Sequence, residues 1–86
     1  MELSTTAKLL REIDGFGRGA QFVANIVQTR MTKPTTRLRG LLALLKAGHE
    51  VSTPNTDVLW VNGRAAEWSI LLATSTLRKR YAGGVR

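Results

Sequence analysis

The chain has 86 residues, which is enough for one small hydrophobic core but not for two. Apolar residues make up 43% of it and prolines number two, which argues against a wholly disordered chain, while the absence of cysteine excludes disulfides and thiolate metal sites. The formal net charge is +7, so an anionic partner is expected. The chain has a single histidine, so a zinc site is not expected.

The positive charge is concentrated in segments. No acidic residue occurs between Gly15 and His49, and a second run without acids extends from Trp68 to Arg86. The basic residues of these two runs are Arg18, Arg30, Lys33, Arg37, Arg39 and Lys46, then Arg78, Lys79, Arg80 and Arg86. Scattered surface cations often serve solubility alone, but this segmental imbalance favours nucleic acid or another polyanion as partner.

Two helices are predicted first. Leu9, Leu10 and Ile13 fall at helical spacing behind possible caps at Ser4, Thr5 or Thr6, which predicts a helix over 5–14. The glycine-rich GFGRG at 15–19 predicts a loop, because glycine loses much backbone entropy in a regular element. A second helix is predicted over 20–30, with an apolar stripe of Phe22, Val23, Ile26 and Val27 opposite Gln21, Asn25 and Gln28.

The third predicted helix, over 33–47, has the clearest boundaries. Thr32 is its expected N-cap and Pro34 falls in the first turn, where a missing N–H removes no helical bond. Gly48 stands where a left-handed residue commonly ends a helix. Its apolar stripe consists of Leu38, Leu41, Leu42 and Leu45.

A β-hairpin over 50–61 should follow, with Pro54 and Asn55 in its turn and Asn62-Gly63 ending its second strand. A fourth helix is predicted over 64–81, because the segment contains no helix breaker before Gly83-Gly84. The first residues lack the features of a secretion signal, and no window approaches about 18 apolar residues. We therefore expect a soluble, cytoplasmic protein.

This order of elements resembles the winged helix-turn-helix family of DNA-binding domains. RMTKPTTRLRGLLALLKAGHEV at 30–51 is similar to the family's turn, recognition helix and exit into the wing, and DVLWV at 57–61 is similar to the wing's returning strand. The resemblance covers roughly residues 5–63. It implies one mostly α domain over 1–86, with a three-helix core, a two-stranded wing and, as an addition, the C-terminal fourth helix.

The face of the third helix opposite its leucines is the candidate DNA-binding surface. A helix turns by about 100° per residue, so Lys33, Thr36, Gly40 and Ala43 share this face, flanked by Arg37 and Arg39. Arginine and threonine can contact base edges or phosphates in a major groove that small residues leave accessible. The alternative is that Gly40 and Ala43 pack against the fourth helix or another subunit.

Further contacts are expected beside this face. Arg30, Thr32, Thr35 and Thr36 suit phosphates at the start of the third helix, where the helix dipole favours anions. GFGRG lacks the features of a nucleotide-binding loop. A simple connector between helices is the favoured interpretation, and the alternative is that Arg18 lies along a DNA strand. Asn55 is the candidate at the uncharged hairpin tip, where the family's wings often carry arginine or lysine.

No catalytic arrangement is expected. The acidic residues are dispersed, and no nucleophile, histidine and acid can be assembled, so we expect no enzyme, no cofactor, no metal and no small-molecule substrate. His49 falls where a histidine interacts favourably with a helix C-terminus. In the fourth helix, Ile70, Leu77 and Tyr81 form a second apolar face, which is either a homodimer surface or part of the core.

These observations predict sequence-specific binding of double-stranded DNA by a small transcription regulator whose third helix enters the major groove. The chain's brevity suits a phage or mobile-element regulator, cytoplasmic and located at the nucleoid when bound. The alternative is an interaction module, for example a phage host-takeover or inhibitor protein, that binds an acidic host protein with the same shape. RNA ranks third, because five aromatic residues offer no evident stacking platform.

Overall fold

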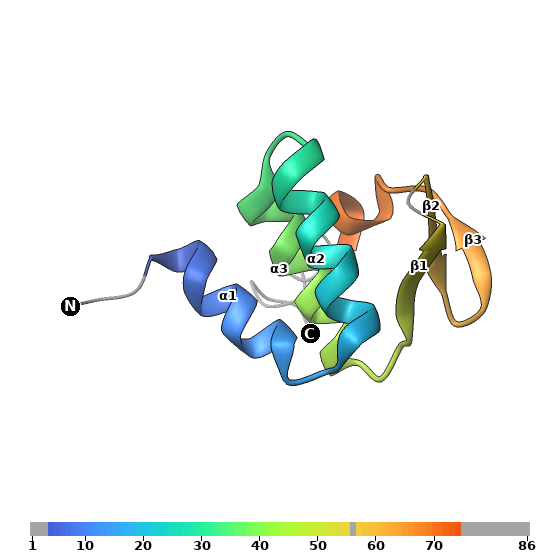
Figure 1. Ribbon diagram of the computed structural model, residues 1–86, viewed down its shortest axis with the longest axis horizontal. Helices are drawn as coiled ribbons and strands as arrows, with labels where there is room; N and C mark the ends of the chain where they lie inside the picture. The colour runs from blue at the N-terminus through green and yellow to red at the C-terminus, as the bar shows by residue number, and fades with distance from the viewer. Residues whose placement is uncertain (1–3, 56, 75–86) are drawn as a thin grey trace, which may run out of the picture.

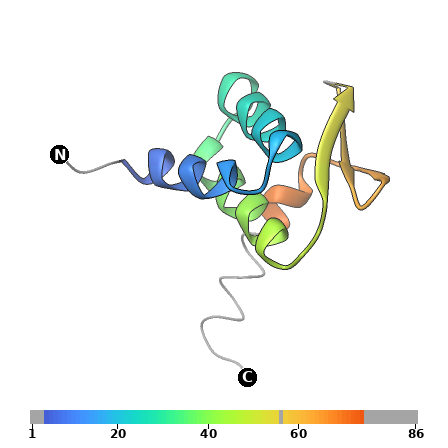
Figure 2. The same ribbon diagram turned by 60° about the horizontal axis from the view of Figure 1, so that its bottom comes forward.

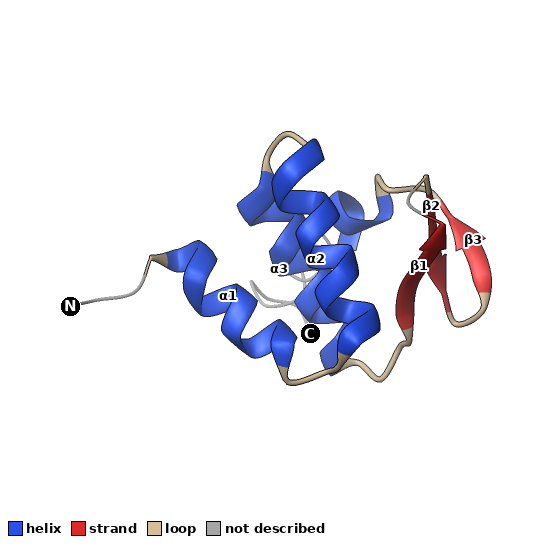
Figure 3. Ribbon diagram, viewed as in Figure 1, coloured by secondary structure: helices blue, strands red, loops and turns tan. Residues whose placement is uncertain are grey.

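The computed structural model describes residues 4–55 and 57–74. Three helices are followed by a three-stranded antiparallel sheet and a short fourth helix, so the protein is α+β (Figures 1 and 3). The elements are α1 (Thr5–Asp14), α2 (Arg18–Arg30), α3 (Pro34–Lys46), β1 (Val51–Asn55), β2 (Val58–Val61) and β3 (Arg64–Ala66). Residues 70–74 form the described part of the fourth helix.

The ends of the helices follow local chemistry in most cases. The Ser4 hydroxyl accepts the Ala7 N–H at 3.1 Å and so caps α1, as expected. Helix α2 begins at Arg18, inside the glycine-rich segment, and Gly17 before it has a φ of 104°, which glycine adopts without a side-chain penalty. Its start was predicted two residues too late.

Helix α3 begins and ends at residues with positive φ. Lys33, and not Thr32, is its N-cap, with a φ of 50° and no side-chain hydrogen bond, so the expected Thr32 cap is wrong. At the other end Gly48 has a φ of 96°, which confirms the left-handed position. The His49 N–H donates to Leu44 O at 3.1 Å and the Gly48 N–H to Leu45 O at 3.0 Å, which is a Schellman motif.

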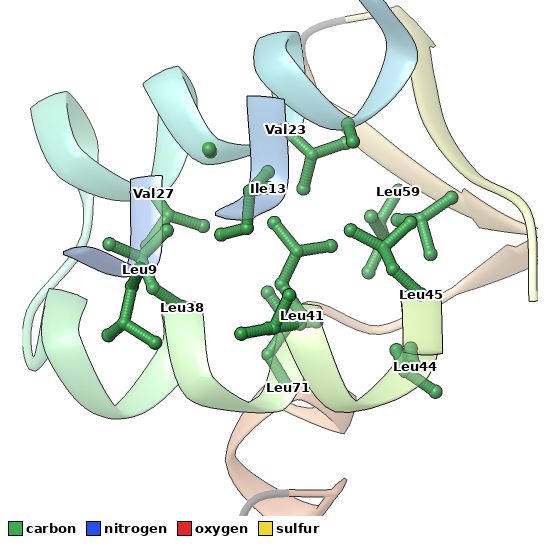
Figure 4. Close-up of a cluster of buried hydrophobic side chains, with 14 residues drawn as sticks. Leu9, Ile13, Val23, Val27, Leu38, Leu41, Leu44, Leu45, Leu59 and Leu71 are labelled. Carbon is green, nitrogen blue, oxygen red and sulfur yellow. The ribbon is translucent and has the colours of Figure 1, made fainter. Parts of the chain in front are cut away.

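The core surrounds α3, whose stripe of Leu38, Leu41, Leu42 and Leu45 is buried as predicted. Helices α1 and α2 cover this stripe, and Leu71 reaches the core from the other side of α3 (Figure 4). Leu44 is buried as well, although it lies outside the predicted stripe. Helix α3 is therefore enclosed on two sides.

The sheet has one strand more than predicted. Strand β1 pairs with β2, and β2 pairs with β3 across the two-residue turn Asn62-Gly63, whose φ values are 53° and 79°. Positive φ at both turn positions is typical of a type I′ hairpin, and Asn-Gly is its usual sequence. The predicted helix over 64–81 is therefore wrong at its start, because hairpin pairing outweighs the helical propensity of Arg64–Ala66.

The arrangement of the two layers positions the surfaces discussed below. The sheet lies to one side of the helices, with α1 at the opposite side, and β1 packs along α2 (Figures 1 and 2). Strand β1 is an edge strand and contains Pro54, which an edge tolerates. Among the described residues, no helix is long and apolar enough to cross a membrane.

Candidate nucleic-acid interface

The basic side chains are largely without acidic partners. Within residues 4–55 and 57–74, the one ion pair joins Lys46 Nζ to Glu12 Oε1 at 3.2 Å, with both side chains about half exposed. The pair connects α3 to α1 and reduces the net charge that Lys46 offers to a ligand. The remaining lysines and arginines of these residues have no carboxylate at ion-pair distance, so no acidic side chain in this part of the protein neutralises their charge.

The α2–α3 turn brings several predicted residues together. Arg30, Thr32 and Lys33 are exposed there, and Thr36 is half-buried in the first turn of α3. The first backbone N–H groups of a helix have no partner within the helix, which makes this end of α3 favourable to anions. The Thr35 hydroxyl lies 2.8 Å from the Thr6 hydroxyl, so it links α3 to α1. The turn is consequently a basic, partly hydroxylated end of the molecule.

Arg37 has an internal role that sequence reasoning missed. Its Nε donates to the Thr32 carbonyl at 2.8 Å, and its Nη1 lies 3.4 Å from the Trp68 carbonyl, to which it donates. The half-buried guanidinium therefore joins the turn before α3 to the segment before the fourth helix. Because a guanidinium carries five donors in a fixed plane, two carbonyls far apart in sequence can share one arginine.

The predicted exposure of Gly40 is wrong. Gly40 is buried, and a Cβ atom added to it would overlap the carbonyl oxygen of Leu71, so only glycine allows this approach of the two backbones. Packing on the fourth helix, the alternative for this residue, is what the structure shows. Ala43 is half-buried and Arg39 is exposed. The open face of α3 is therefore a narrow strip that contains Thr36, Arg39 and Ala43.

The other predicted contacts lie apart from this strip. Arg18 is exposed at the first position of α2, and twelve residues of helix, about 18 Å, separate it from Arg30. Asn55 is exposed at the hairpin, where its Oδ1 accepts the Asp57 N–H at 3.1 Å. The predicted residues thus form one cluster at the α2–α3 turn, with Arg18 and Asn55 outside it.

The proposed dimer surface is only partly described. Ile70 is half-buried and packs against the core, which is the alternative reading for this residue. Leu77 and Tyr81 lie outside the described residues.

The outer face of α2 was not predicted as a site. Gln21, Asn25, Gln28 and Thr29 are exposed there as their spacing requires, but Phe22, assigned to the buried stripe, is 61% exposed. Val23, Ile26 and Val27 of that stripe are buried. Phe22 falls at the edge of the apolar stripe. Its angular position on the helix was the signal that could have excluded it from the residues predicted to be buried.

Two shallow grooves border this face. One, of about 530 Å³, lies between α2 and β1 and is lined by Phe22, Asn25, Ile26, Thr53 and Pro54, among others. The second, of about 570 Å³, includes Phe16, which is 47% exposed. Gly19 and Ser52 line both grooves, so the two adjoin where α2 meets β1.

The described acidic and histidine side chains form no cluster. In this part of the chain no group of three or more His, Cys, Asp or Glu residues could hold a metal ion. The Asn62 amide Nδ2 lies 2.8 Å from His49 Nδ1, and Asn62 Oδ1 accepts the Glu50 N–H at 2.9 Å. These contacts link the segment that follows α3 to the turn between β2 and β3.

Comparison with known protein families found no matching family, and comparisons with curated proteins and with solved structures found no match either.

Proposed function

We propose that the protein binds double-stranded DNA without catalysis and acts as a small transcription regulator of winged-helix type. The observation that carries the proposal is the α2–α3 turn, where Arg30 and Lys33 are exposed without a carboxylate partner in the described residues. Arg39, on the same acid-free stretch, adds a third free cation. Neutralising DNA phosphates with such cations releases counterions and supplies most of the affinity.

The order of elements supports the winged-helix assignment. Three helices precede an antiparallel β1–β2 hairpin, and β3 extends this wing by one strand. In this arrangement α2, the turn and α3 form the helix-turn-helix unit. Because α3 is enclosed along much of its length, it approaches the duplex with its N-terminal end, through Lys33, Thr36 and Arg39.

A salt titration with duplex DNA tests the proposal. If Arg18, Arg30, Lys33 and Arg39 each neutralise one phosphate, the logarithm of affinity should fall with the logarithm of salt concentration at a slope of about −3.6. Replacing one of these residues by alanine should make the slope less steep by about 0.9. Undetectable binding to any duplex at low salt, or a slope near zero, would refute DNA binding.

A second candidate function is supported by the exposed aromatic residues. Phe16 and Phe22 stand beside the grooves between α2 and β1, where an apolar segment of an acidic protein could insert. Capture from a nuclease-treated lysate separates the two functions, with Phe22→Ala as the matched variant. A protein partner that survives nuclease and is lost with Phe22→Ala supports this candidate, whereas loss of all partners after nuclease supports DNA binding.

A further inference from the structure

We infer that the outer face of α2, rather than α3, contacts base edges in the major groove and selects A·T base pairs. The inference rests on the DNA binding proposed above. It concerns a different question, namely which helix distinguishes one sequence from another.

Accessibility favours α2. Helix α3 buries Leu38, Gly40, Leu41, Leu42, Leu44 and Leu45, and neighbours cover it from two sides. A helix that reads several base pairs from a major groove needs several exposed side chains on one side, and of the three residues in the open strip of α3 only Arg39 is exposed. Helix α2 offers that side: the face opposite its buried residues is exposed along the whole helix, and α2 lies in front of α3 in Figure 1.

The side chains on this face match the chemistry of A·T pairs. Asn25 and Gln28 have exposed side-chain amides with no hydrogen-bond partner in the described part of the chain, and Gln21 makes only a 3.5 Å contact with Asp14 O. Asparagine and glutamine can pair with the N6 and N7 atoms of adenine through two hydrogen bonds. Gln21, Asn25 and Gln28 share one face and span about 10 Å, or about three base steps of 3.4 Å.

Phe22 adds an apolar side chain beside these amides. Its exposure would be unfavourable in water, but a phenyl ring can pack against the 5-methyl group of thymine in the major groove. The Phe22 ring and the Asn25 amide border the same groove as Pro54 of the hairpin. The wing therefore stands beside α2, so a duplex on this face would meet the hairpin as well.

The charges on α2 fit an anionic groove. The helix carries no acidic residue, and arginines occupy its first and last positions, Arg18 and Arg30. They are about 18 Å apart along the axis, so one arginine lies beyond each end of the segment from Gln21 to Gln28. With α2 along the groove, these two cations add attraction for the phosphates on either side of the three base steps.

A selection from random duplexes, followed by affinity measurements, tests the inference. Wild-type protein should select sites that contain A·T pairs. The double variant Asn25→Ala/Gln28→Ala should lower the ratio of specific to non-specific affinity about tenfold or more, with little change in non-specific binding. Arg39→Ala is the matched control: it should weaken binding to all duplexes and leave the ratio unchanged.

Replacing thymine by uracil in the selected site removes only the 5-methyl group. The wild-type protein should then bind more weakly, and Phe22→Ala should bind both duplexes equally. A ratio that falls with Arg39→Ala but not with the amide double variant would assign base contacts to α3 and overturn the inference. DNA binding without any sequence preference would overturn it too while leaving the proposed function intact, and absence of binding would refute both.

Discussion

Helices α2 and α3 have the same length and nearly the same apolar content, yet they occupy opposite situations in the fold. Helix α3 is packed on two sides, by α1 and α2 and by the segment that contains Leu71. Helix α2 is packed on one side and leaves amides, two arginines and a phenyl ring in solvent. A small residue on the polar face of a helix, such as Gly40 in α3, therefore predicts close packing against another segment as readily as it predicts entry of the helix into a DNA groove.

The largest effect is expected from Leu41→Ala. Leu41 lies at the centre of α3 with no exposed surface, so the truncation removes apolar burial and leaves a cavity. The free energy of unfolding should fall by about 2–5 kcal/mol, measured by urea denaturation. Asn25→Ala on the open side of α2 should change the free energy of unfolding by no more than about 0.5 kcal/mol. Similar losses of stability in both variants would contradict the difference in packing between the two helices.

The second-largest loss of stability is expected from Gly40→Ala. The added methyl group would overlap the Leu71 carbonyl, so the fourth helix must shift, at a cost of about 1–3 kcal/mol by thermal or urea unfolding. Gly15→Ala is the control, since its φ is −65° and its nearest neighbour, Glu12 O, lies 3.4 Å from the new atom. Stabilisation by Gly40→Ala, as helix propensity alone predicts, would show that the fourth helix does not pack at this position.

Arg37→Ala should destabilise the protein by about 1–2 kcal/mol, because the Thr32 and Trp68 carbonyls lose a donor. Arg39→Ala, two residues away and exposed, should have almost no effect on unfolding and should weaken DNA binding. Equal stability of the two variants would contradict the internal role of Arg37. The comparison also shows why Arg39, and not Arg37, is suitable for testing DNA contact.

The smallest effect on stability is expected from Lys33→Gly. Lys33 has a φ of 50°, a conformation that costs a side-chain-bearing residue about 1 kcal/mol and that glycine adopts freely. The variant should be more stable by about 1 kcal/mol and should bind DNA more weakly, with a salt slope less steep by about 0.9. Lys33→Ala should show the same loss of binding without the gain in stability. DNA affinity that is unchanged in both variants would remove Lys33 from the interface.

Local sequence signals located the elements well where one short-range interaction decides the outcome. The α1 boundaries, the left-handed Gly48 and the buried leucine stripe of α3 were predictable from caps, positive φ and helical spacing. The third strand was not predicted, although Asn62-Gly63 is a strong hairpin signal, because Arg64–Ala66 has helical propensity when considered alone. Burial of Phe22 was also predicted wrongly, although its position at the edge of the apolar stripe of α2 indicated an exposed side chain.

The sequence by itself determined the net positive charge, the acid-free stretch from Gly15 to His49, and three helices with their apolar faces. These features follow from composition and from periodicities of a few residues. Only the tertiary structure decided that Gly40 lies under Leu71, that Arg37 links two distant carbonyls and that α2 keeps an open face. Such features depend on contacts between residues about thirty positions apart, and the local pattern does not encode which side of a helix a distant segment will cover.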